Sequence, residues 1–195
     1  MFWQVWGGGT PACLVSCQSL TGLLSFGDMR VLAIDPSLRG TGFAILESSH
    51  SKVRALAYGT VKNRADLLPS GCLVAIHERI KDLITEYQPD CVAVEGVIFV
   101  QSYRTAITLG AARGVAILAA AGRGLPIYEY APRRVKQSVV GQGGAQKSQV
   151  AFMVRALLGL TETPTADAAD ALAIGLTHLR MGESAALGLI QAERI

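Results

Sequence analysis

Two short apolar runs in this chain each end in a carboxylate, and a segment with helical periodicity separates them. The first run, 31–34, leads into Asp35, and the second, 91–94, leads into Glu95. Over roughly 67–87, apolar residues recur at the spacing of an amphipathic helix. A strand, a helix and a strand in this order predict a parallel crossover, because parallel strands need a long connection. The chain is therefore expected to adopt an α/β fold.

Asp35 and Glu95 are expected to meet at one edge of the sheet. Each ends a predicted buried strand, and the carboxyl ends of neighbouring parallel strands lie at the same edge. A carboxylate in such a position is costly unless a metal, a base or several hydrogen-bond donors partner it. Each carboxylate also has a simpler interpretation. Asp35, which precedes Pro36, caps a turn in that interpretation, and Glu95 is a surface residue at the end of a strand.

Asp167 and Asp170 stand three residues apart at the start of a helix that is predicted to follow Pro164. This spacing places both carboxylates on one helix face. Aspartate near a helix N-terminus is also favoured by the helix dipole, so capping is an alternative explanation. The surrounding alanines, however, let this face lie close to the sheet. Together with the two strand-end carboxylates, the pair supplies hard oxygen donors that suit Mg²⁺ or Mn²⁺ and not zinc.

A basic block precedes this helix. The net charge of the chain is only +3, yet no acidic residue occurs in 130–160. Five basic residues lie in the same segment: Arg133, Arg134, Lys136, Lys147 and Arg155. A basic block near isolated carboxylates predicts a polyanionic partner, and a solvated charged face is the alternative. The glycine-rich loop 141–144 before Lys147 could also present backbone amides to a phosphate, although it lacks the spacing of a Walker loop.

The other elements are consistent with a single α/β domain. Predicted strands at 41–46 and 53–61 follow the first strand with short connections and indicate an antiparallel meander. A further strand is expected at 125–130, and helices are expected at 101–121, from Pro132 onward, at 147–158 and after Pro164. In the helix at 101–121, Gly110 and Gly114 create a face small enough for close approach of another backbone. Tight packing on the sheet and a homodimer seam explain this face equally well.

Composition limits the domain boundaries and the compartment. With 195 residues, half of them hydrophobic and 17% charged, the chain predicts one domain with a substantial core. Residues 1–28 are expected to be an extension, either disordered or the product of a wrongly chosen start codon; 29–182 form the domain and 183–195 a tail. Cys13, Cys17, Cys72 and Cys91 have neither zinc-site spacing nor the look of a disulfide framework, which indicates a reducing, cytoplasmic setting. No membrane span is expected, because the apolar part of 101–121 is short and contains Arg113.

From residue 29 to about residue 180 the chain resembles the RuvC family of Holliday junction resolvases, within the ribonuclease H-like superfamily. The motifs that carry the resemblance are Asp35-Pro36, Val94-Glu95, LGAARGVAI at 109–117, VKQSVVG at 135–141, KSQV at 147–150 and ADAADALA at 166–173. The region of resemblance covers about four-fifths of the chain. The resemblance implies a ribonuclease H-like mixed five-stranded sheet flanked by helices.

The same resemblance implies a function. A homodimer would bind a four-way DNA junction, nick two opposed strands symmetrically and leave ligatable 5′-phosphate and 3′-hydroxyl ends, in cooperation with a branch-migration motor. By position, the catalytic metal ligands would be Asp35, Glu95, Asp167 and Asp170, and Lys136 and Lys147 would contact DNA together with Arg133 of the basic block. Two Mg²⁺ ions per site are expected, with Mn²⁺ able to substitute.

Two positions depart from the family pattern. Ser37 occupies a turn position where the family commonly has glycine, so a non-glycine residue fills a turn that a positive φ would suit. The aromatic residue that often stands at the third position after the glutamate is replaced by Ile98, and Phe99 follows it. Stacking on an unpaired base would then pass to Phe99 or be lost.

Three other functions compete with junction cleavage. An aspartate before a glycine-rich turn also opens the ATP-binding fold of sugar kinases and actin-like proteins, but those proteins need two such domains and a longer chain. A junction-binding protein without catalysis is disfavoured by the four intact carboxylates. A ribonuclease H-like nuclease that acts on RNA is the nearest rival, and the helix with Gly110 and Gly114 is the main feature that separates it from a dimeric resolvase.

Overall fold

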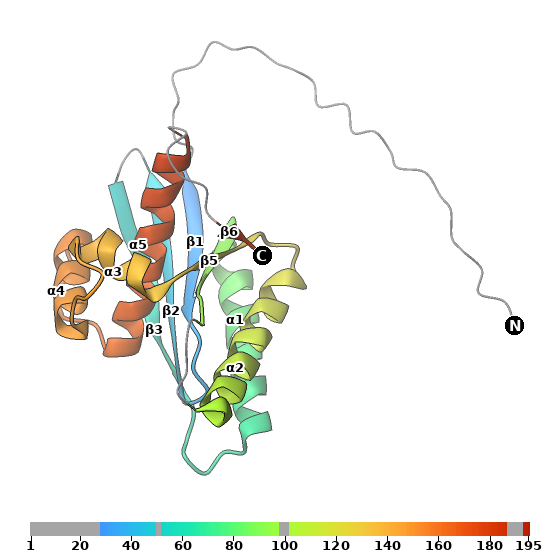
Figure 1. The fold of residues 1–195 in the computed structure, drawn as a ribbon. Helices are drawn as coiled ribbons and strands as arrows, with labels where there is room; N and C mark the ends of the chain where they lie inside the picture. The colour runs from blue at the N-terminus through green and yellow to red at the C-terminus, as the bar shows by residue number, and fades with distance from the viewer. Residues whose placement is uncertain (1–27, 50–51, 98–101, 187–192) are drawn as a thin grey trace, which may run out of the picture.

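The computed structural model describes residues 28–49, 52–97, 102–186 and 193–195. The strands are β1 (Met29–Asp35), β2 (Gly40–Ser49), β3 (Lys52–Lys62), β4 (Cys91–Glu95), β5 (Ile127–Tyr130) and β6 (Glu193–Arg194). The helices are α1 (Pro69–Tyr87), α2 (Tyr103–Ala121), α3 (Pro132–Val140), α4 (Lys147–Leu158) and α5 (Ala166–Ala186). Helices α1 and α2 cover one face of the sheet, and α3, α4 and α5 cover the other (Figure 1).

The sheet is mixed, with the order β3-β2-β1-β4-β5-β6. β1, β2 and β3 form an antiparallel meander, while β1, β4 and β5 run parallel to one another. The α/β class and the mixed five-stranded sheet are thus confirmed. The sixth strand, β6, is a two-residue addition that pairs antiparallel with β5, and no pattern in the sequence predicts it.

The central strand β1 explains why the first apolar run lacks alternation. Residues 31–34 are fully buried, because helices cover both faces of the sheet at this strand. Side chains alternate across a strand, so Val31 and Ala33 contribute to the core beneath α3–α5. Leu32 and Ile34 contribute to the core beneath α1 and α2. One short run of sequence therefore joins both cores.

Helix α1 begins slightly later than the periodicity predicts. Its first residue is Pro69, which suits the first helical position but disfavours helical geometry in Leu68 before it. The buried face includes Ile76, Ile80 and Leu83. The helix ends where Gln88 adopts a left-handed conformation with φ of 46°.

Helix α2 has an apolar composition but a largely exposed surface. Its fully or almost fully buried positions are four alanines: Ala112, Ala116, Ala119 and Ala120. Among the described residues it is the one helix that is long and apolar enough to cross a bilayer. This finding rests on length and composition alone. Arg113 lies in the middle of α2 and pairs with Glu129 on β5, and a paired charge of this kind is expected in a helix that packs on a sheet.

A buried polar network ties α5 to the sheet. The ring of His178 lies between Cys91 on β4 and Tyr130 on β5, with Nε2 3.1 Å from the Cys91 thiol and Nδ1 2.8 Å from the Tyr130 hydroxyl. Burial lowers the pKa of His178 to about 4 and raises the pKa of Cys91 to about 12. The imidazole is therefore neutral at pH 7, and one ring nitrogen can donate while the other accepts. Cys91 is a free, buried thiol.

Candidate active site

Asp35 and Glu95 lie side by side where the parallel strands β1 and β4 end. The register pairs Ile34 with Val94, so the next residue on each strand is a carboxylate. Both side chains are partly buried. Burial, followed by the negative charge of Asp170, raises the pKa of Asp35 to about 6. Burial, followed by the charge of Asp35, raises the pKa of Glu95 to about 7.

The first turn of α5 brings the other two aspartates to this edge. Gly40 and Gly42 on β2 leave the space for it, because a Cβ on Gly42 would lie 2.0 Å from the backbone oxygen of Asp167. A Cβ on Gly40 would lie 2.8 Å from Oδ2 of Asp167. Further along α5, Gly175 makes a similar close approach, since a Cβ there would lie 2.6 Å from Leu46. The glycines of the turn after Asp35 therefore set the distance between α5 and the sheet.

Gly42→Ala is expected to reduce the activity of this site at least tenfold and to destabilise the fold by about 1–3 kcal/mol, as overpacking of a tight contact does. The added methyl would collide with the Asp167 backbone and displace the start of α5 from the sheet. The measurements are urea unfolding and the turnover rate under saturating substrate. Gly182→Ala is the matched control, because no atom lies within 4 Å of a Cβ at Gly182. Equal behaviour of the two variants would contradict the packing role of Gly42.

Two lysines of the basic block face the carboxylates. Nζ of Lys147, at the start of α4, donates to Oδ2 of Asp170 at 2.9 Å, and this bond raises the pKa of Lys147. The charge of Lys136 on α3 acts to lower the pKa of Glu95. At the α4 N-terminus, Gln146 and Gln149 form a reciprocal capping box. The backbone amides of Gln146 and Gln149 are thus satisfied by side chains.

The turn after Asp35 does not need glycine at position 37. Among the described residues, Gln88 is the one non-glycine residue with a positive φ, so Ser37 has ordinary backbone geometry. The buried Thr41 hydroxyl donates to the Ser37 carbonyl at 2.6 Å and accepts from the Ser37 amide at 3.2 Å. The turn at Ser37 therefore does not use the positive φ that a glycine would suit, and the Thr41 side chain closes it.

Other predicted site residues lie apart from the carboxylates. Gly110 and Gly114 are on the exposed surface of α2, and nothing lies within 4 Å of a Cβ built on either residue. Arg133 lies on α3 at a pocket described below. Ile98 and Phe99 lie outside the described residues, so base stacking by Phe99 stays a prediction.

One ion pair beside the site has no counterpart among the sequence predictions. Arg113 on α2 donates to Glu129 on β5, and Nε of Arg113 is buried without a described partner. The pair adjoins the backbone that follows Glu95, because a Cβ on Gly96 would lie 2.5 Å from Oε1 of Glu129. The sequence feature that could have indicated this ion pair is Gly96, the small residue directly after Glu95. The pair connects α2 with the end of the catalytic edge.

The donor set fits a hard divalent cation. All four candidate ligands are carboxylates, and the raised pKa values of Asp35 and Glu95 show that negative charge at this edge is unfavourable without a cation. No group of three or more Asp, Glu, His or Cys side chains is placed to hold an ion in the part of the chain that the structure describes. The Lys147 ammonium, which occupies Oδ2 of Asp170, supplies positive charge in this arrangement.

Comparisons with known proteins point in one direction. Residues 31–178 match the family model described as crossover junction endodeoxyribonuclease RuvC. The protein of that name from Akkermansia muciniphila is 58% identical over 151 residues, covering 77% of this chain and 90% of the relative. The one from Sodalis glossinidius is 46% identical over 155 residues, covering 80% and 89%.

Solved structures give the same result for the fold. RuvC from T. thermophilus in complex with a Holliday junction substrate superimposes with a TM-score of 0.77 at 36% identity, covering 86% of this chain and 99% of that chain. The yeast mitochondrial Holliday junction resolvase superimposes with a TM-score of 0.62 at 14% identity, covering 83% and 82%. The second likeness shows a shared fold and extends to no particular residue.

Proposed function

This chain belongs to the RuvC family of crossover junction endodeoxyribonucleases, and we propose that it resolves four-way DNA junctions by nicking two opposed strands. The observation that carries the proposal is the convergence of Asp35, Glu95 and the first turn of α5 at one sheet edge, within a family match over 31–178. Relatives at 58% and 46% identity carry this enzyme name, and a solved relative holds a Holliday junction substrate.

We propose that Asp35, Glu95, Asp167 and Asp170 hold two Mg²⁺ ions, which Mn²⁺ can replace. Divalent cations bound there supply polarisation of the scissile phosphodiester and of the attacking water. The chain's contribution is to fix four oxygen donors on two strands and one helix. Lys147 balances the charge of Asp170 before substrate binds, and with Lys136 and Arg133 it contacts backbone phosphates.

The exposed stripe of α2 supports a homodimer. Tyr103, Ile107 and Leu118 are 83%, 69% and 62% exposed, and together with Gly110 and Gly114 they recur at intervals of three or four residues along one helix face. An apolar stripe of this kind marks a protein interface. A second copy of the chain fits it best, because the two glycines permit close helix approach and a two-fold dimer presents two active sites to two opposed strands.

The remaining proposals follow from the family and are not required by the geometry. We assign the nuclease domain to 29–182 and an extension to 1–28, and we treat 183–195 as a tail whose strand β6 pairs with β5. A cytoplasmic location and cooperation with a branch-migration motor fit an enzyme of recombination and repair.

A synthetic four-way junction with each strand labelled in turn tests the proposal. In Mg²⁺ the protein should nick two strands of like polarity at symmetry-related positions, and ligase should reseal the products. The comparison substrates are linear duplex DNA and an RNA–DNA hybrid of the same sequence. Cleavage of the RNA strand together with an intact junction would replace the proposal with an RNA-directed nuclease.

A further inference from the structure

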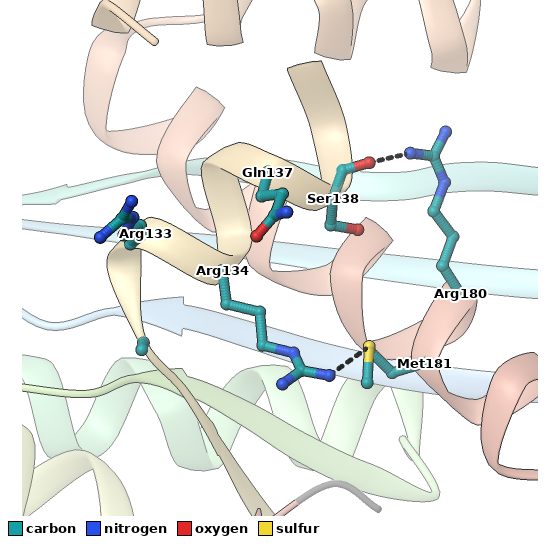
Figure 2. A pocket seen from close by; sticks show the side chains of 7 residues that line it. Arg133, Arg134, Gln137, Ser138, Arg180 and Met181 are labelled. Atoms are coloured by element: carbon teal, nitrogen blue, oxygen red, sulfur yellow. Dashed lines mark hydrogen bonds between the residues drawn. The ribbon is translucent and has the colours of Figure 1, made fainter. Parts of the chain in front are cut away.

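A pocket of about 600 Å³ lies between α3 and the C-terminal half of α5 (Figure 2). Three arginines line it: Arg133 and Arg134 from α3, and Arg180 from α5. The other lining residues are uncharged, namely Ala131, Gln137, Ser138 and Met181. None of the described residues that line the pocket is acidic. Arg180 forms one wall, where it donates to the backbone carbonyl of Ser138.

Arg134 is held in the pocket by a weak contact. Its guanidinium donates to the thioether sulfur of Met181 at 3.5 Å, as Figure 2 shows. A thioether is a poor acceptor and carries no charge, so the contact orients the guanidinium without neutralising it. A guanidinium has five N–H donors in a planar fork that matches the oxygens of a phosphate. The arrangement therefore presents an oriented phosphate-binding group.

The start of α3 has the favourable Pro132, but no described group there offsets the positive end of the helix dipole. Its N-cap is Ala131, which makes no side-chain cap hydrogen bond, and the first turn contains no acidic residue. Arg133 and Arg134 instead add positive charge to the positive end of the helix dipole. Sequences break such local rules mainly at functional sites. An anion at this position would satisfy both the dipole and the arginines.

The glycine-rich loop 141–144 supports the same site. A Cβ on Gly143 would lie 2.6 Å from Cγ and 3.1 Å from Nε of Arg133. The loop backbone therefore packs directly against the arginine stem and limits where its guanidinium can point. This gives the loop a function other than direct phosphate binding by its amides.

The pocket lies within reach of a DNA strand that occupies the active site. Arg180 is ten residues beyond Asp170 on α5, which corresponds to about 15 Å along the helix axis. That distance is about four base steps of B-DNA at roughly 3.4 Å per step. Helix α3 also carries Lys136, two residues beyond Arg134.

We infer that this pocket binds the sugar–phosphate backbone of the DNA arm leading away from the cleaved phosphate, with Arg134 as its central contact. The inference rests on the proposed junction-nuclease function and extends it to a second anchoring point. The contact is independent of base sequence, because it involves phosphates alone. It raises affinity and fixes the direction of the arm without entering the chemical step.

Arg134→Gln tests the inference, with Arg123→Gln as the matched control. Arg123 follows α2 on the opposite side of the sheet, where it donates to Thr85. For Arg134→Gln we expect junction affinity to fall about threefold to tenfold and the slope of log affinity against log salt to decrease by about one. Arg134→Lys, which keeps the charge, should retain the slope.

The outcomes separate the two proposals. If the wild type nicks junctions but Arg134→Gln and Arg123→Gln have equal affinities and salt slopes, the pocket inference is wrong and the proposed function stands. If the wild type does not bind junctions, both fail. A titration with pyrophosphate distinguishes the source of the phosphate. Thermal stabilisation that Arg134→Gln abolishes, with unaltered junction binding, would assign the pocket to a small phosphate compound and overturn the assignment to DNA.

Discussion

Asp35→Asn is expected to reduce junction nicking at least about 10³-fold while junction binding stays within about threefold. Loss of several kcal/mol of charge stabilisation at a metal site corresponds to this factor, at tenfold per 1.36 kcal/mol. Asparagine keeps the shape of the side chain but not its charge. The control is Asp82→Asn, an exposed carboxylate on α1. Nicking by Asp35→Asn at the control rate would contradict the metal assignment.

The same substitution should stabilise the protein when divalent cations are absent. The pKa of Asp35 is raised to about 6 in the folded state, so the folded protein holds this proton more tightly than the unfolded chain. The stabilisation that protonated Asp35 gives the folded state is therefore complete below about pH 4 and is lost as the pH rises through 6. At pH 8, Asp35→Asn should be more stable than the wild type by about 1–3 kcal/mol.

Urea unfolding in EDTA at pH 4 and pH 8 measures this difference. We expect the free energies of unfolding of the wild type and Asp35→Asn to differ at pH 8 and to be similar at pH 4. Asp82→Asn should match the wild type at both pH values. Added Mg²⁺ should then stabilise the wild type more than the variant, because ligands stabilise the state that binds them. A wild type as stable as Asp35→Asn at pH 8 would show that the site carries no electrostatic strain.

The pairing of Asp35 with Glu95 could be predicted because it depends on local patterns. Apolar runs that end in carboxylates, separated by one helix, specify parallel neighbours, and parallel strands end at a common edge. The approach of α5 to β2 could not be predicted in the same way. Gly42 and Asp167 are in contact although they are 125 positions apart in the sequence, and no local pattern near either residue predicts this contact. Gly40 and Gly42 act sterically, by leaving space for the start of α5.

Side-chain partners that depend on tertiary contacts also escaped the sequence patterns. The turn at Ser37 was expected to favour glycine, but Thr41 supplies the hydrogen bonds that hold it. His178 lies in an apolar helix segment, and its partners come from β4 and β5. Periodicity predicts which face of an element is buried. It does not predict which polar groups meet inside the core.

Replacing both Gly110 and Gly114 with glutamine is expected to weaken the proposed homodimer at least about 100-fold. Two bulky side chains in a close helix seam cost about 3 kcal/mol, which corresponds to this factor in Kd. The monomer should tolerate them, because no atom lies within 4 Å of a Cβ at either glycine and glutamine is a better helix former. Light scattering at micromolar protein measures the oligomeric state, and Gly182→Gln is the matched control.

The loss of the dimer should also change the pattern of cleavage. On a supercoiled plasmid that extrudes a cruciform, a dimer makes two nicks within the lifetime of one complex, and the product is linear DNA. The double glutamine variant should instead release nicked circles, since a single active site remains on each bound protein. The Arg113–Glu129 pair, which joins α2 to the backbone after Glu95, should be intact in this variant, because neither residue lies in the exposed stripe. A variant that stays dimeric and still linearises the plasmid would place the interface on another surface.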